Sequence, residues 1–117
     1  MGQKKYSVQA LGSINAVVIS ATPAVIETLL IYNASAGIRV VKFYNKATTP
    51  APVGDLALLT AAIQIPAGTS KELVMTDDGI QFSTGLGICI TGAAPLNDAT
   101  AVTAGDVLVT LYYNDMV

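Results

Sequence analysis

Hydrophobic and polar positions along the chain follow the pattern of β-strands. Short runs rich in β-branched and aromatic residues are bounded by Gly, Pro, Asn and Asp, an arrangement typical of strands joined by turns. The clearest run covers residues 38–45, in which side chains alternate between two faces and each face carries one cation, Arg39 or Lys42. We therefore expect this strand to be buried on one side and partly covered on the other.

Eight segments carry strand signals, and none has the periodicity of an amphipathic helix. Residues 56–65 are ambiguous because helix formers dominate 56–62, but the run is short and we predict a strand. Pro50 and Pro52 exclude a central strand over 47–55, and Asp78-Gly79 predicts a tight turn. The predicted strands are 17–19, 25–33, 38–45, 56–65, 71–75, 80–83, 87–91 and 107–113.

The spacing of these strands predicts an all-β fold. Short strands with a turn every 8–12 residues or so are typical of sandwiches and barrels. About eight strands fit an antiparallel two-sheet sandwich with jelly-roll-like connections. A chain of 117 residues is long enough to bury one core. We predict one β-sandwich domain over 1–117, with residues 1–9 either in an extended N-terminal arm or in the first strand.

The low charge of the chain narrows the function classes. Charged residues make up 12% of the chain, hydrophobic residues 52%, and the net charge is −2. Such a composition excludes disorder and argues against phosphate-driven binding of nucleic acid. Ser, Thr, Asn, Gly and Pro interrupt the uncharged runs, so we expect no membrane span. The composition fits a subunit that buries apolar surface in an assembly; the alternative is a monomer with a Ser/Thr-rich surface.

Residue types for catalysis and metal binding are scarce. The chain has no His, no Trp and one cysteine, Cys89, which lies between isoleucines and is expected to be a small buried hydrophobe. The pair Asp77-Asp78 lacks the spacing of a calcium loop and is expected in a turn. Asp98 and Asp106 flank an uncharged loop, and nothing in the sequence brings them together. We predict a protein that is not an enzyme, with no catalytic residues, no cofactor and no metal site.

Glycines and tyrosines give two weaker candidates for a ligand-binding site. A phosphate loop needs a following helix, whereas the glycines at 85, 87 and 92 lie between predicted strands and are expected in turns or bulges. Four tyrosines could stack on bases or sugars. Because no basic residues accompany them, we favour packing in the core or an interface. These tyrosines are Tyr32, Tyr44, Tyr112 and Tyr113.

The basic residues form two groups. Lys4 and Lys5 either belong to an arm that docks on an acidic partner or lie in a solvated terminus. Arg39, Lys42 and Lys46 follow one strand, and we expect them to protect an exposed sheet edge from pairing with another chain.

Two segments resemble small proteins of tailed bacteriophages and prophages. They are VVKFYNKATTPAPVGD at 40–55 and GIQFSTGLGICITGAA at 79–94, the latter leading to NDATAVTAGDV at 97–107. The resemblance covers roughly residues 38–113 and leaves 1–37 without a motif. It implies a virion structural protein, in particular a capsid decoration (cement) protein. Such proteins are small, β-rich and often trimeric.

The resemblance implies two partners, the major capsid protein and further copies of this chain, with a homotrimer as the expected oligomer. The protein would be made in the cytoplasm of a bacterial host and would lie on the capsid surface, over joints between major capsid subunits. No catalytic residues come with this family. The alternatives are a β protein of the phage tail, neck or fibre, and a carbohydrate- or nucleotide-binding β module that uses the tyrosines.

Overall fold

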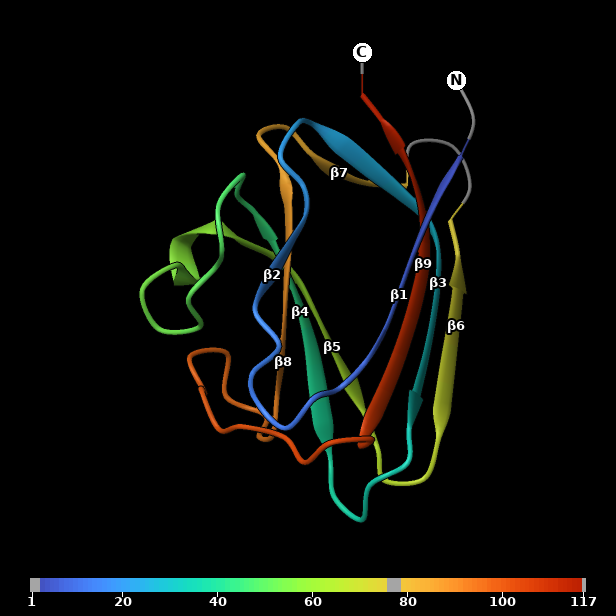
Figure 1. Ribbon diagram of the computed structural model, residues 1–117, viewed down its shortest axis with the longest axis vertical. Helices are drawn as coiled ribbons and strands as arrows, with labels where there is room; N and C mark the ends of the chain where they lie inside the picture. The colour runs from blue at the N-terminus through green and yellow to red at the C-terminus, as the bar shows by residue number, and fades with distance from the viewer. Residues whose placement is uncertain (1–2, 76–78, 117) are drawn as a thin grey trace.

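The computed structural model describes residues 3–75 and 79–116 as two antiparallel β-sheets packed face to face. Figure 1 shows the sheets nearly edge-on, with β1, β9, β3 and β6 in one layer and β2, β8, β4 and β5 in the other. The predicted all-β, two-sheet sandwich is confirmed. The elements are β1 (Lys4–Gln9), β2 (Val17–Ser20), β3 (Ala24–Asn33), β4 (Arg39–Asn45), the 3-10 helix η1 (Leu56–Leu58), β5 (Leu59–Ile65), β6 (Ser70–Val74), β7 (Ile80–Phe82), β8 (Leu86–Thr91) and β9 (Val107–Asp115).

The order of the strands is that of a jelly roll. One sheet has the order β1-β9-β3-β6, with the short β7 paired to the end of β3, and the other has the order β2-β8-β4-β5. Without β7, each sheet contains four strands, and the chain crosses repeatedly between the sheets, as two interlocked Greek keys require. The jelly-roll-like connections predicted from the strand count are therefore present.

The core lies between the sheets because each strand alternates apolar and polar side chains. In β9, Val107, Val109 and Leu111 are buried while Leu108 between them is exposed. Side chains of both sheets meet in this layer, including an edge-to-face contact of Phe43 with Phe82 whose ring centroids are 6.5 Å apart. This period of two fixes the register, since a shift by one residue would turn the apolar set outwards.

The N-terminal segment forms a strand rather than a free arm over the residues that the structure describes. Lys4–Gln9 pair with β9 in antiparallel register, from Lys4 opposite Tyr113 to Gln9 opposite Leu108. Tyr6 and Val8 pack against the core. Residues 1–2 of the proposed arm lie outside the described residues.

Two other predictions need correction. Leu56–Leu58 form η1 instead of the start of a strand, and β5 begins only at Leu59. The helix formers that made this segment ambiguous fold into a single turn, closed by a bond from the Leu58 amide to the Asp55 carbonyl (2.9 Å). The predicted edge is also wrong: β4 lies between β8 and β5, so Lys42 is on an inner strand and protects no edge.

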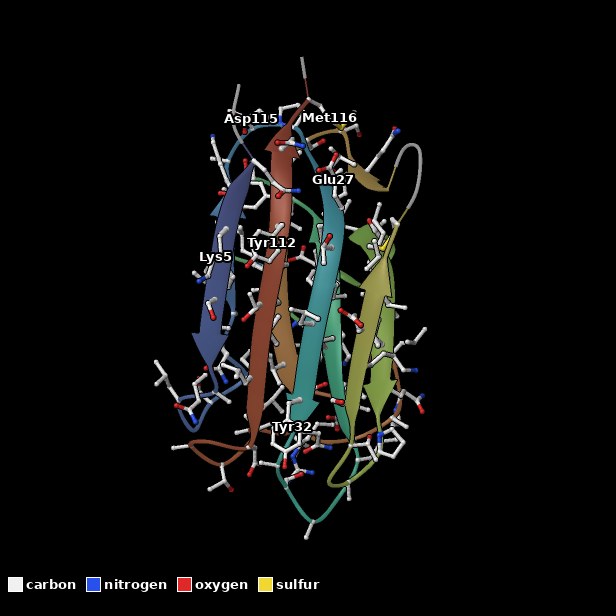
Figure 2. All side chains as sticks on the ribbon, turned by 90° about the vertical axis from the view of Figure 1, so that its right-hand side faces the viewer. Lys5, Glu27, Tyr32, Tyr112, Asp115 and Met116 are labelled. Carbon is white, nitrogen blue, oxygen red and sulfur yellow. The ribbon has the colours of Figure 1, made fainter. Side chains whose placement is uncertain are left out.

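Two long loops cover the outside of the four-stranded sheet. In Figure 1 both loops, 46–58 and 92–106, lie on the side of this sheet that faces away from the other sheet. The Lys46 ammonium group pairs with the Asp55 carboxylate at 2.6 Å and closes the first loop. Arg39 Nε donates to Asp106 Oδ2 at 3.0 Å and fixes the end of the second. Within residues 3–75 and 79–116, no such layer covers the outside of the five-stranded sheet, which Figure 2 shows from the front.

Candidate functional site

The two carboxylates considered as an acid–base pair have separate structural roles. Asp98 accepts hydrogen bonds from the Thr100 hydroxyl (2.7 Å) and from the amides of Ala93 and Thr100, all within its own loop. The bond from the Thr100 hydroxyl is the main cause that lowers the pKa of Asp98. Asp106 instead accepts from Arg39 and from a backbone amide. Each carboxylate stabilises a loop, and no contact joins them.

The glycines and the aspartate pair give no ligand site. A Cβ on Gly85 would lie 2.7 Å from the Ala47 Cα, and one on Gly87 would lie 3.0 Å from the Pro50 ring. These glycines therefore allow the 46–58 loop to lie against the sheet. Asp77 and Asp78 lie outside the described residues. Within 3–75 and 79–116, no cluster of three or more His, Cys, Asp or Glu side chains could hold a metal ion.

The four tyrosines do not form one platform. Tyr44 is fully buried on the four-stranded sheet, under the loops. Tyr113 packs against the core between the sheets. Only Tyr32 and Tyr112 point outward from the five-stranded sheet (Figure 2). Tyr32 is 46% exposed and lies near one end of β3.

The outside of the four-stranded sheet is buried and partly polar. We call it the covered face. Lys42 Nζ is fully buried there and donates to the carbonyl oxygens of Asp98 (3.0 Å) and Pro95 (3.4 Å). Burial lowers the pKa of Lys42, an effect that the negative charge of Asp98 opposes. The covered face consists of Val40, Lys42 and Tyr44 of β4 and Gly87, Cys89 and Thr91 of β8.

Cys89 is buried on the covered face, as the sequence predicts. Its thiol lies 3.9 Å from the carbonyl oxygen of Pro50. Burial raises the pKa of Cys89 to about 11. Because the thiolate is the nucleophilic form, this burial and raised pKa disfavour a role for Cys89 as a nucleophile.

The outside of the five-stranded sheet is an exposed surface with a regular pattern. We call it the open face. The strand register aligns its side chains in three rows that run across β1, β9, β3 and β6. The rows are Lys5, Tyr112, Thr28 and Val74; then Ser7, Thr110, Leu30 and Glu72; then Gln9, Leu108, Tyr32 and Ser70.

Apolar and hydroxyl side chains dominate the open face. Val74 is 67% exposed and Leu108 44%. The hydroxyl groups of Ser7 and Thr110 satisfy each other at 2.9 Å across neighbouring strands. A groove of about 370 Å³ runs over this face, and Leu30, Tyr32 and Leu108 are among its lining residues. Lys5 and Glu72 are the charged members of the rows, and they lie on the two outer strands, β1 and β6.

Sequence reasoning did not find the open face, although part of its signal was present. Leu108, Thr110 and Tyr112 alternate with buried residues along β9, so their shared direction is readable from the sequence. Which sheet carries the covering loops depends on the tertiary fold. The lysines of the N-terminus have different roles: Lys4 pairs with Asp115 at 2.6 Å, whereas Lys5 belongs to the open face.

No protein-family model matches this chain, and no curated protein sequence matches it significantly. Among the described elements, no helix is both long enough and apolar enough to cross a membrane. Since these comparisons suggest no function, a functional interpretation depends on the geometry, and in particular on the open face.

Proposed function

We propose that this chain is a bacteriophage virion structural protein, namely a capsid decoration protein that self-associates and binds over joints between major capsid subunits. The observation that supports this best is the open face, where Leu30, Tyr32 and Leu108 are exposed on a regular surface with two charges in its rows. The cores of protein–protein interfaces are depleted of charge and enriched in tyrosine. Large exposed apolar patches on soluble proteins commonly mark such interfaces.

The scaffold is suited to a structural role. The Lys46–Asp55 ion pair closes the first loop, and Arg39 and the buried Lys42 of β4 hold the second loop through Asp106 and the carbonyl of Asp98. A decoration protein acts through many copies, each with a modest contact, so a rigid surface limits the entropy lost at each contact.

The fold itself leaves several functions open. Jelly rolls occur in viral capsid proteins and in lectins, and a fold alone does not assign a function. The likeness of segments 40–55 and 79–107 to phage proteins favours the virion. The distribution of the tyrosines disfavours a sugar-stacking module, since Tyr44 and Tyr113 are packed inside.

Cosedimentation with capsids tests the proposal. Purified protein is mixed with expanded capsids from a phage that lacks this gene, and the bound copies are counted. We expect saturation at a fixed number of copies per capsid and immunogold label on the heads of intact virions. Label on tails, necks or fibres, or no binding to capsids, would contradict a decoration role.

A matched pair of variants tests whether capsid binding depends on the open face, either directly or through self-association of the bound copies. Leu108→Lys places a charge in the open face and is expected to reduce binding to capsids. Leu56→Lys places the same charge on η1, where Leu56 is similarly exposed (41%, against 44% for Leu108), and is expected to bind like the wild type. Equal binding by both variants would show that the open face is not involved.

A further inference from the structure

We propose that the open face packs against the open face of a second copy, in a dimer whose two-fold axis runs parallel to the strands. The inference makes the self-association in the proposed function specific, and rests on that part of it alone. It requires no virion partner. Three features support it: the places of the two charges, the apolar centre of the face and its size.

The two charged side chains of the rows occupy opposite edges of the open face, and a third, Glu27 of β3, lies beyond the rows and accepts a hydrogen bond from Gln3 (2.8 Å). Lys5 is on β1 and Glu72 is on β6, with β9 and β3 between them. Lys5 lies in the row of Val74, and Glu72 lies in the next row. Adjacent rows on one face of a strand are about 7 Å apart. A lysine side chain spans that distance.

A two-fold axis parallel to the strands places β1 of one copy over β6 of the other. Lys5 of each copy then lies within reach of Glu72 of the other copy, and the contact occurs twice by symmetry. An axis across the strands would instead place β6 over β6 and β1 over β1. Because this axis also reverses the direction of the strands, it brings Glu72 over Glu72 where it crosses the row of Glu72, or Lys5 over Lys5 where it crosses the row of Lys5. Like charges then repel each other, and Lys5 and Glu72 of the two copies stay on opposite edges. The positions of Lys5 and Glu72 thus favour the first arrangement.

The same arrangement joins the apolar parts of the two faces. The inner strands β9 and β3 carry Leu108, Tyr112, Leu30 and Tyr32, and the axis places β9 of one copy over β3 of the other (Figure 2). Side chains of the second copy can fill the groove of about 370 Å³ beside Leu30 and Leu108. Face-to-face packing of twisted sheets is a common way to bury such side chains.

The size of the face fits a small but specific dimer. Four strands about 4.8 Å apart and up to about 30 Å long give a flat surface of roughly 500 Å². Corrugation by side chains increases the accessible area towards the ~800 Å² per partner that is usual for a specific complex. We therefore expect a dimer that dissociates on dilution.

Sedimentation velocity over a range of concentrations tests the dimer. The wild type is expected to change from one copy of 12.0 kDa to twice this mass as its concentration rises. Lys5→Glu and Glu72→Lys are each expected to weaken association about tenfold, because each replaces two attractive contacts with two repulsive ones. The double variant restores two attractive contacts and is expected to associate like the wild type.

One control variant, Lys71→Glu, separates the effect of side-chain position from that of net charge. Lys71→Glu changes the net charge as Lys5→Glu does, but Lys71 is opposite the buried Ile31 and so points to the other side of β6 from Glu72. It is expected to leave association unchanged. Circular dichroism establishes that each variant is folded. A wild type that stays monomeric, a mass of three copies, or a double variant as weak as the single ones would overturn the proposal.

Capsid binding distinguishes this inference from the proposed function. A wild-type monomer that still cosediments with capsids would overturn the dimer and leave the decoration role standing. A charge-dependent dimer that never binds capsids or virions would support the dimer and overturn the decoration role. Binding of capsid protein to the open face with no dimer at any concentration would identify a different occupant and also overturn the dimer.

Discussion

The outer faces of the two sheets have opposite surface chemistry. The covered face buries polar groups: the Lys42 ammonium and the hydroxyls of Tyr44 and Thr91, which have no hydrogen-bond partner within the described residues. The open face exposes Leu108 and Val74, which a protein would ordinarily bury. Buried polar groups without a partner cost about 1–3 kcal/mol each. Exposed apolar groups lose the stabilisation of about 25 cal/mol per Å² that burial would give.

The difference shows where a partner can bind. On the covered face, loops 46–58 and 92–106 already lie over the strands and are held by Lys46–Asp55 and Arg39–Asp106. A partner would have to displace them and leave Lys42 without its carbonyl acceptors. The open face needs no rearrangement, so binding there costs little conformational free energy.

The largest expected effect comes from the same substitution on each face. Val40→Asp places a carboxylate on the covered face at a fully buried position, whereas Leu30→Asp places it on the open face at a position that is 36% exposed. An unpaired buried charge costs about 3–5 kcal/mol, and a change at a solvent-facing position usually less than about 1 kcal/mol. Urea denaturation should therefore show Val40→Asp unfolded or severely destabilised and Leu30→Asp nearly native. Similar losses in both variants would show that the two faces are equally covered.

The next largest loss of stability is expected where Gly85 packs closely against the start of the 46–58 loop. In Gly85→Ala the new Cβ would lie 2.7 Å from the Ala47 Cα and 2.9 Å from the carbonyl oxygens of Lys46 and Ser20. Because these are backbone atoms, the loop must move, and we expect a loss of about 2–3 kcal/mol in the free energy of unfolding.

Gly54→Ala is the control for this substitution. Its Cβ would meet only the Ala51 Cβ, at an ordinary 3.7 Å. Thermal denaturation should show an unchanged midpoint for Gly54→Ala and a clearly lower one for Gly85→Ala. Equal midpoints would mean that the 46–58 loop does not lie tightly against the sheet.

Much of this fold could be predicted from period-two alternation. The runs at 25–33, 38–45 and 107–113 correspond to β3, β4 and β9 because each alternates between a core side and an outer side. The sequence of β1 is compatible with both an arm and a strand, because Lys4 and Lys5 are typical of a solvated end. Its inward side chains, Tyr6 and Val8, were the available signal.

The covered face could not be predicted because tertiary contacts create it. A lysine in an alternating strand normally marks a solvent side. Lys42 is buried only because the carbonyls of Pro95 and Asp98, more than fifty residues away, fold over it. The open face could not be predicted either, because its exposure depends on the loops lying over the other sheet. The sequence around Leu108 or Tyr32 does not show where these loops lie.

Alkaline pH is expected to destabilise the covered face by a smaller amount. Burial raises the pKa of Cys89 from 9.0 to about 11, so above pH 9 the unfolded chain loses this proton before the folded one does. Stability then falls as pH rises, by about 1 kcal/mol between pH 8 and 10. The raised pKa of Tyr44 acts in the same direction, and the lowered pKa of Lys42 acts against it.

Cys89→Ala isolates the contribution of the thiol. Its free energy of unfolding, measured by urea denaturation at several pH values, should fall less steeply than that of the wild type above pH 9. The absolute stability of the variant does not matter, because only the slopes are compared. Parallel slopes would mean that the thiol ionises equally easily in both states, and so that the covered face admits water.

The smallest effect on stability is expected on the open face, where Leu108→Thr shortens a side chain that is 44% exposed and keeps a residue suited to a strand. At low protein concentration we expect its free energy of unfolding to stay within about 0.5 kcal/mol of the wild type. At high concentration the two should differ: association of folded chains raises the unfolding temperature of the wild type by mass action, and the variant, with a weaker contact, gains less. Calorimetry at two protein concentrations a hundredfold apart measures both the stability of the single chain and the stabilisation that association adds. A loss of stability at low concentration would show that Leu108 supports the fold of a single chain, and the open face would then differ from the covered face in exposure alone.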